Sequence, residues 1–382
     1  MHNNKLLLAA NPTPNHDFGF GSVRLHDAFV FWKQIEVTAK GAFDWSRLDA
    51  LVAAHAGREI MYTLGQTPDW ANGQTTSFYD FGPVPPTNPQ DYYDFVTALA
   101  TRNRDVYGGA IKAWEIWNEP DNVKLWTGTT QQLIDISTVA AGIIKGIDPN
   151  AVIVGPGFLA NGWAWFHEFA RLGGLSYCDK VGYHAYPSPS QPERTEVYLR
   201  RVRASLDVLG INKPLWNTEF GYIGYTYGGQ TFDNFDFRNN EMAANTMPGP
   251  LAASYITRAL ISAINAGAER SFWYAMDAPI MIIQLVDRVD ETIVLPAATA
   301  YKHFADLISG GALGRTEAAG NTYSVAFVSG NGRGRGRIMW CVDERTASVD
   351  LSAYKSGEDA LGNAITLSVN YTLTDMPIFV FN

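Results

Sequence analysis

The sequence predicts an α/β protein: a (β/α)8 barrel over residues 1–305 and a small all-β domain over residues 306–382. Short apolar runs alternate with helical patterns through most of the chain, which is typical of βα units around a parallel sheet. After residue 309 the pattern changes to short strands separated by Gly, Asn and Asp. The length of 382 residues fits a barrel of roughly 250–300 residues with a small second domain.

Seven runs are expected to form barrel strands, with six helices between them. The strands are 22–25, 59–64, 111–117, 151–155, 180–184, 214–218 and 271–274, and the helices are 45–54, 90–102, 130–146, 162–172, 193–209 and 252–266. An eighth strand is expected before residue 22, at residues 5–10 or 17–21. Thr129 precedes one helix as an N-cap does, and Gly173 follows the end of another.

The C-terminal region is expected to form a small β-sandwich that packs on the barrel. Its predicted strands are 322–328, 337–341, 348–351, 364–369 and 378–381. The tract 329–337 alternates Gly and Arg, as some nucleic-acid-binding segments do. We interpret it as a hairpin loop, because the tract is short and the protein is acidic.

The composition argues against several classes of partner. A net charge of −9 and a pI near 5.3 argue against binding to nucleic acid or to an anionic membrane surface.

The apolar run at 6–10 is too short for the core of a signal peptide. We expect either a cytoplasmic protein or a secreted or periplasmic one whose signal has been trimmed. Cys178 and Cys341 are expected to be free, and we expect a monomer with no metal and no cofactor.

One strand is expected to end at a carboxylate, in the stretch Trp-Glu-Ile-Trp-Asn-Glu-Pro-Asp at 114–121. Pro120 cannot donate to a sheet ladder and restricts the residue before it, so the strand should stop near Glu119. Strict alternation would place Glu115, Trp117 and Glu119 on one face. The two glutamates would then lie roughly 13 Å apart, too far to act on one bond. Glu115 is therefore expected to be a buried, hydrogen-bonded residue, and any partner of Glu119 must come from another strand.

A second strand runs out at Glu219, in Pro-Leu-Trp-Asn-Thr-Glu-Phe-Gly at 214–221. If the strand at 22–25 is the second strand of the barrel, the strand that ends at Glu119 is the fourth and the strand that ends at Glu219 is the seventh. In a closed eight-stranded barrel all C-terminal strand ends face one mouth. We therefore expect the two carboxylates to converge there on a small substrate.

These paired strand ends, Trp-Asn-Glu-Pro at 117–120 and Thr-Glu-Phe-Gly at 218–221, resemble those of clan A glycoside hydrolases. Four upstream segments resemble glycoside hydrolase family 39: 23–27, 31–36, 41–45 and 67–71. The resemblance covers roughly residues 20–300. Within the family the chain resembles bacterial endo-acting exopolysaccharide hydrolases.

The resemblance implies a retaining double displacement, with Glu119 as general acid/base and Glu219 as nucleophile. Such a mechanism needs carboxyl groups about 5–5.5 Å apart. Burial among tryptophans beside a charged Glu219 would raise the pKa of Glu119. Arg24 would keep Glu219 ionised, although a purely structural ion pair is the alternative.

Further substrate-binding residues are implied by the same resemblance. His184 and Tyr186 are spaced to share a face and would contact the nucleophile or the substrate, unless His184 is only a core histidine. Asn118 would bind the sugar hydroxyl next to the anomeric carbon, and Trp273 would form the floor of the subsite. Three more tryptophans are candidates either for the walls of sugar subsites or for the core: Trp32, Trp70 and Trp126.

The expected substrate is an oligo- or polysaccharide cut internally. The alternatives are an exo-acting β-glycosidase such as a β-xylosidase, and a barrel that binds carbohydrate without cleaving it. A phosphate-handling barrel is disfavoured because 271–273 offers no Gly-rich loop.

Two other segments bear on the expected site. The long segment 221–250 is expected to shape the cleft, with Tyr225, Tyr227 or Phe235 reaching substrate. His26 and Asp27 are disfavoured as a metal or base pair, since no third ligand is suitably spaced.

Overall fold

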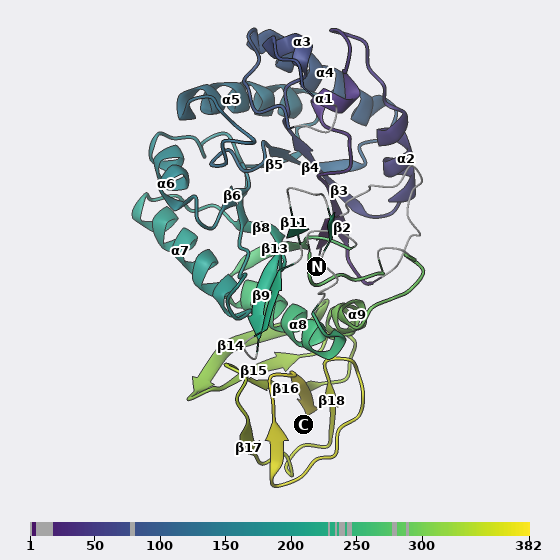
Figure 1. Ribbon diagram of the computed structural model, residues 1–382, viewed down its shortest axis with the longest axis vertical. Coiled ribbons are helices and arrows are strands. Elements are labelled where there is room, and N and C mark those ends of the chain that lie inside the picture. The colour runs from purple at the N-terminus through teal and green to yellow at the C-terminus, as the bar shows by residue number, and fades with distance from the viewer. Residues whose placement is uncertain are drawn as a thin grey trace.

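The computed structural model describes residues 2–4, 18–76, 81–227, 230–233, 235–236, 241–242, 247–276, 281–287 and 290–382. For residues 2–4, and for those described between 224 and 242, it describes the backbone alone. Figure 1 shows a large α/β part and, below α8 and α9, a smaller part made of C-terminal strands.

Parallel strands form the centre of the α/β part. Among the described residues, nine strands pair in the order β5-β4-β3-β2-β1-β13-β8-β7-β6, and every pairing is parallel. The strands are β1 (His2–Asn4), β2 (Ser22–Leu25), β3 (Glu59–Leu64), β4 (Ile111–Ile116), β5 (Val152–Val154), β6 (Phe158–Leu159), β7 (Val181–His184), β8 (Leu215–Phe220) and β13 (Ala268–Trp273). The outermost strands of this order, β5 and β6, follow each other in the chain. Isolated parallel bridges pair Asn118 with Gly157 and Val154 with Lys180.

Helices surround these strands in Figure 1. They are α1 (Trp32–Ile35), α2 (Ser46–Ala54), α3 (Asp69–Asn72), α4 (Pro89–Asp105), α5 (Thr130–Ile147), α6 (Trp163–Arg171), α7 (Arg194–Val208), α8 (Gly249–Asn265) and α9 (Pro296–Ile308). The start of α5 is fixed by a capping box, in which Thr129 and Gln132 each accept the other's backbone N–H. Gly173 follows α6 with a φ of +82°, a conformation that glycine adopts without steric cost.

The strands bury side chains on both faces, which is why they read as nearly continuous apolar runs. One face packs against the helices, with Trp114 and Ile116 of β4 meeting Leu133 of α5 in one large core. The opposite face supplies a smaller cluster that draws one residue from each of five strands: Met61, Ala113, Val154, Trp216 and Phe272.

The C-terminal strands form an antiparallel sheet in the order β14-β15-β16-β20-β18, with a separate β17-β19 pair. Their bounds are β14 (Ala312–Ala319), β15 (Thr322–Val328), β16 (Arg335–Cys341), β17 (Ala347–Val349), β18 (Ser356–Asp359), β19 (Tyr371–Leu373) and β20 (Ile378–Phe381). Phe327, Trp340 and Phe379 of this sheet share a core with α8 and α9. The Gly- and Arg-containing tract spans the turn between β15 and β16, so its interpretation as a hairpin loop is confirmed.

Several expectations about the elements are corrected. The first strand is His2–Asn4, not 17–21, and residues 5–10 lie outside the described residues. Residues 364–369 are described and form no strand, because Ala364 makes only a single bridge with Glu358. The expected domain boundary at 305/306 lies within α9.

The segment 221–250 contains two short antiparallel pairs, β9 (Gly224–Tyr227) with β10 (Gln230–Asp233) and β11 (Phe235–Asp236) with β12 (Glu241–Met242). The side chains of Tyr225, Tyr227 and Phe235 lie outside the described part of the chain.

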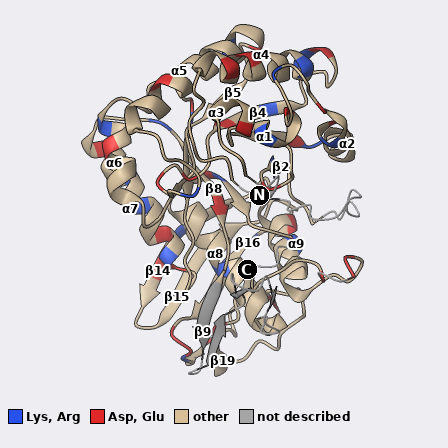
Figure 2. Ribbon diagram, turned by 45° about the horizontal axis from the view of Figure 1, so that its top comes forward, with Lys and Arg blue, Asp and Glu red and all other residues tan. Residues whose placement is uncertain are grey.

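None of the described helices is both long and apolar enough to cross a membrane. Charged residues lie mainly along the helices and loops in Figure 2. Arg24, Glu115 and Glu219 are exceptions, since they are buried on the central strands.

Candidate active site

The backbone has an unusual conformation directly after β4. Strand β4 ends at Ile116, and the non-glycine residues Trp117 and Glu119 both have positive φ, at 77° and 43°. This region is sparsely populated by L-residues, so neighbouring contacts must hold it. The N–H of Trp117 donates to the carbonyl of Leu64, and that of Glu119 donates to the carbonyl of Gly157 at 2.9 Å.

This turn corrects the expected alternation. Trp117 does not share a face with Glu115, because its side chain turns into the core beneath the helices. Its indole N–H donates to the carbonyl of Leu125 at 2.9 Å, and its ring meets that of Trp126 edge-on at 4.8 Å. After the anchored Trp117 the chain continues beside residue 157, where Asn118 makes a parallel bridge with Gly157, and Glu119 lines a cavity.

Glu219 lies within β8, one residue before its end, so the strand extends two residues past the predicted range 214–218. The Nη1 of Arg24 donates to Glu219 Oε2 at 2.6 Å, and the hydroxyl of Tyr186 donates to the other oxygen, Oε1. Both oxygens of the Glu219 carboxylate are therefore engaged, one of them by a full positive charge.

Arg24 of β2 organises the floor beneath the cavity. Its side chain is fully buried, and besides Glu219 it donates to Glu115 Oε2 at 2.7 Å and to Asn118 Oδ1 at 2.6 Å. Burial lowers the pKa of Arg24, but the carboxylates of Glu115 and Glu219 more than offset this, so the guanidinium stays charged. Glu115 also accepts from Thr63 at 2.9 Å, which confirms it as a buried, hydrogen-bonded residue.

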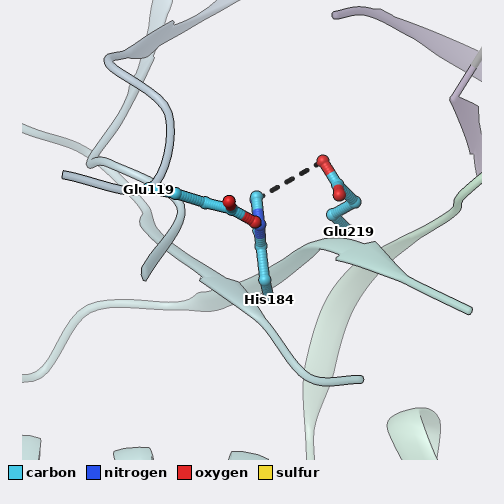
Figure 3. Close-up of side chains that lie close together, drawn as sticks. All are labelled: Glu119, His184 and Glu219. Carbon is cyan, nitrogen blue, oxygen red and sulfur yellow. Dashed lines mark hydrogen bonds and ion pairs between the residues drawn. The ribbon is translucent and has the colours of Figure 1, made fainter. Parts of the chain in front are cut away.

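His184, the last residue of β7, lies between the two glutamates (Figure 3). A hydrogen bond of 2.7 Å joins its Nδ1 to Glu119 Oε1, and its Nε2 lies 3.9 Å from Glu219 Oε2. Burial lowers the pKa of His184, which favours the neutral imidazole. One carboxylate oxygen from each glutamate and one nitrogen of this ring all lie within 4.8 Å of one another.

The two carboxyl groups have different electrostatic surroundings. Burial raises the pKa of Glu119 to about 7, with Glu115 adding to the effect while Arg24 and a hydrogen bond from Asn122 oppose it. The pKa of Glu219 is also raised, by burial and by the charge of Glu119, although His184, Arg24 and Tyr186 oppose this shift. Because Glu219 accepts from a guanidinium and a phenol, we assign the negative charge to Glu219 and the proton to Glu119.

A cavity of about 520 Å³ opens above this pair. Its wall includes both glutamates together with Asn118 and Tyr186, as expected from the sequence. It also includes His26, Asp27 and Tyr274, which had not been expected to contact substrate. The signal that could have found them is their position, because they directly follow β2 and β13 and so lie at the same strand ends as the glutamates.

The four tryptophans proposed as sugar platforms are not among the described residues of the cavity wall. Trp273 is fully buried against Phe220, and the following residue, Tyr274, lines the cavity in its place. Trp32 and Trp126 belong to the core beneath the helices. Trp70 is half-buried, and its indole N–H donates to the carbonyl of Glu36 at 2.7 Å. Composition alone cannot tell which face of an element an indole occupies.

Arg24 and His184 are likewise fully buried and act from beneath the cavity wall. The set Glu119, His184 and Glu219 offers donor types that divalent cations accept. However, both oxygens of Glu219 already accept hydrogen bonds, and the Arg24 guanidinium lies 2.6 Å from one of them. A cation there would be repelled by this guanidinium, so we interpret the three residues as an acid–base set.

Comparisons with known proteins identify a family of similar sequences. The sequence model of "Glycosyl hydrolases family 39" matches residues 3–207. A β-xylosidase from Caldicellulosiruptor saccharolyticus is 29% identical over 157 residues, which span 38% of this chain and 32% of that protein. The match therefore covers about a third of that relative's length.

Solved structures resemble the whole chain. A family 39 glycoside hydrolase from Bacteroides cellulosilyticus WH2 aligns over 100% of this chain and 80% of its own, with a TM-score of 0.71 and 18% identity. A family 39 β-xylosidase from Caulobacter crescentus aligns over 95% of this chain and 89% of its own, with a TM-score of 0.65 and 18% identity. At these identities the likeness concerns the fold.

Proposed function

The chain belongs to glycosyl hydrolases family 39, whose sequence model covers more than half of it, and we propose that it is a retaining glycosidase. The observation that carries the proposal is the close approach of Glu119 and Glu219, whose nearest oxygens lie within 4.8 Å. Retaining glycosidases hold their carboxyl groups about 5–5.5 Å apart, whereas inverting enzymes need about 6.5–9.5 Å to admit a water molecule. The spacing supports the retaining pathway.

In the proposed first step, a Glu219 oxygen attacks the anomeric carbon while Glu119 gives its proton to the leaving glycosidic oxygen. The new bond joins the sugar to Glu219, and the bond that breaks releases the leaving alcohol. In the second step Glu119, now ionised, takes a proton from water, which attacks the same carbon and frees Glu219. Arg24 and Tyr186 hold Glu219 in place for both steps.

We also infer that the central sheet closes into a (β/α)8 barrel in which β5 and β6 occupy one strand position. Three observations support closure. The two outermost strands are consecutive in the chain, isolated bridges link their segment to both neighbours, and one cluster combines residues of β5 with residues of β8 and β13. The structural relatives support the same architecture. We propose that the strands after Ile308 form a second, small β domain.

The bond that is cut is proposed from the relatives. Two of them are named β-xylosidases, which favours an exo-acting β-glycosidase of that kind. An endo-acting enzyme, which the sequence favoured, is the second candidate. Phe81 and Ile223 support it, because these apolar residues line the cavity while 43% and 37% exposed, where a further sugar ring could stack. The substrate is an oligo- or polysaccharide in both cases.

The experiment is hydrolysis of xylo-oligosaccharides and an aryl β-glycoside panel by wild type, Glu119→Gln and Glu219→Gln, with product sizing. Both variants should lose roughly 10³-fold or more in kcat/KM on glycosides with poor leaving groups. Glu168→Gln, an exposed substitution on α6, is the matched control and should keep wild-type rates. Near-wild-type rates in either active-site variant would remove that residue from the mechanism. Monosaccharide products alone indicate the exo enzyme, and mixed lengths indicate the endo enzyme.

A further inference from the structure

Asp27 occupies a position in the cavity wall where the backbone disfavours a side chain. It lies two residues after β2 with a φ of +53°, a conformation that glycine adopts far more readily than aspartate. Its side chain is 23% exposed and lines the same cavity as Glu119 and Glu219. A non-glycine residue in such a conformation at a functional site suggests that its side chain has a role.

The contacts of Asp27 orient its carboxylate. The hydroxyl of Tyr274, which also lines the cavity, donates to Asp27 Oδ2 at 2.8 Å. Oδ1 lies 3.4 Å from Nε2 of His26. A carboxylate has about four acceptor positions, so these two contacts leave it able to accept another hydrogen bond. Burial raises the pKa of Asp27 to about 6, against the effects of Tyr274 and Arg24, so the group is mostly ionised above neutral pH.

Asp27 approaches a bound ring from a different part of the wall than Asn118 does. Asp27 and Tyr274 follow β2 and β13, which flank β1, whereas Asn118 follows β4. Asn118 is the expected partner of the hydroxyl next to the anomeric carbon. Asp27 is therefore placed to meet a hydroxyl elsewhere on the ring.

We propose that Asp27, oriented by Tyr274, determines specificity by accepting a hydrogen bond from a hydroxyl of the sugar ring bound against Glu219. The inference rests on the proposed glycosidase function and names a substrate class for it. The ring in this subsite is a neutral sugar with that hydroxyl free, because a third carboxylate beside Glu119 and Glu219 repels a sugar that carries its own negative charge.

A purely structural role predicts a different pattern of rates. If Asp27 only holds Tyr274 in place, its removal slows the hydrolysis of all substrates, whichever hydroxyls they carry. If Asp27 binds one hydroxyl, omitting that hydroxyl from the substrate lowers kcat/KM in wild type but not in a variant that lacks the Asp27 carboxylate. Omitting any other hydroxyl lowers kcat/KM equally in both enzymes. The two roles therefore separate in a comparison of deoxy substrates within each enzyme.

The experiment measures kcat/KM for a 4-nitrophenyl β-glycoside and its 3-deoxy and 4-deoxy analogues, using the parent sugar that wild type hydrolyses fastest among xyloside, glucoside, galactoside and mannoside. The enzymes are wild type, Asp27→Gly, Asp27→Asn and Asp343→Gly. Asp343 is a matched control, because it is an exposed aspartate at φ +58° in the C-terminal region. The kcat/KM for the parent substrate is divided by the kcat/KM for each deoxy substrate measured on the same enzyme preparation. A partly inactive variant therefore does not distort the ratio.

In wild type one deoxy analogue should be hydrolysed about 10- to 100-fold less efficiently than its parent, as for a lost hydrogen bond to a charged group. In Asp27→Gly that ratio should fall to near 1, and in Asp27→Asn it should fall part of the way, while Asp343→Gly keeps the wild-type ratio. Identical ratios in wild type and both Asp27 variants would overturn the inference and leave the glycosidase function standing. No hydrolysis of any parent by wild type, or of xylo-oligosaccharides, would overturn both.

Discussion

At the scale of single residues, the site depends on how one guanidinium is shared. Arg24 donates to Glu115, Glu219 and Asn118, and it lies beneath the cavity where water does not compete for its N–H groups. Its charge favours the ionised form of Glu219, which also accepts from Tyr186. Among the described residues no guanidinium forms an ion pair with Glu119, and burial raises its pKa to about 7. This contrast in surroundings supports the opposite protonation states that the proposed acid catalysis requires.

This difference predicts the alkaline limb of the pH profile. Glu119 must be protonated to act as an acid, so kcat/KM should fall as the pH rises through about 7. Asn122 donates to Glu119 and lowers its pKa, so Asn122→Ala should shift this limb to higher pH. The measurement is kcat/KM against pH with an aryl glycoside whose leaving group needs protonation. A 2,4-dinitrophenyl glycoside, which leaves without a proton, is the control and should show a weaker limb. A limb that is unchanged by Asn122→Ala would contradict the assignment to Glu119.

At the scale of elements, the end of β4 positions Glu119, the proposed acid. The strand stops at Ile116, and Trp117 fixes the following turn by packing against Trp126 and donating to Leu125. Gly65, with a φ of +145°, faces this indole, where an added Cβ would meet the ring at 3.5 Å. The position of Glu119 thus depends on aromatic packing outside the cavity.

Trp126→Ala should therefore impair both stability and catalysis. Removing this buried indole leaves a void beside Trp117 and should cost about 3–5 kcal/mol of unfolding free energy. We expect kcat to fall more than tenfold in protein that remains folded, because the support of the Glu119 turn relaxes. The measurements are urea denaturation and kcat on the same preparation. Trp163→Ala, on half-buried Trp163 of α6, is the matched control and should leave kcat unchanged. Wild-type kcat in folded Trp126→Ala would show that the turn does not need this packing.

The same element shows where prediction from sequence stops. Apolar runs predicted β2 and β3 to the residue, and Pro120 correctly indicated that a strand ends near Glu119. The positive φ of Trp117 and Glu119 could not be predicted from the sequence, because neither residue type indicates a left-handed backbone conformation. Strict alternation consequently assigned Trp117 to the wrong face.

Burial of the aromatic residues was equally hidden from the sequence. Trp273 and Tyr274 are adjacent at the end of β13, and the alternation of side chains places Trp273 in the core and Tyr274 in the cavity wall.

Two strands also gave too weak a signal to be predicted. The first strand, His2–Asn4, is short and polar, so it carries no hydrophobic signal. Strand β14 was missed for a related reason, since its mostly exposed Ala, Gly and charged residues resemble a loop.

At the scale of the whole molecule, a partly buried ion pair joins the α/β part to the C-terminal sheet. Arg258 of α8 is fully buried and donates to both oxygens of Glu193, each at 2.8 Å. The indole of Trp340 in β16 donates to the same carboxylate at 2.7 Å. Glu193, which immediately precedes α7, therefore joins three elements that are far apart in the sequence.

Glu193→Ala should destabilise the fold strongly, because it leaves the Arg258 charge buried without its partner. The expected loss is about 3–5 kcal/mol of unfolding free energy, measured by urea denaturation. Glu196→Ala is the control, in the first turn of α7, since its pair with Arg200 is partly exposed and should contribute only about 0.3–0.5 kcal/mol. If both variants unfold at the same urea concentration, the Arg258 pair does not stabilise the contact between the two parts.

The central claim is that Glu219 forms a covalent bond to the sugar while Glu119 moves the proton. The most direct measurement is to trap that intermediate with a 2-deoxy-2-fluoro glycoside carrying an activated leaving group, and to locate the label by peptide mass spectrometry. The account predicts one sugar per chain, attached to Glu219, and no labelling of Glu219→Gln. A label on Glu119 or on another residue, or turnover with inversion and no covalent adduct, would contradict it.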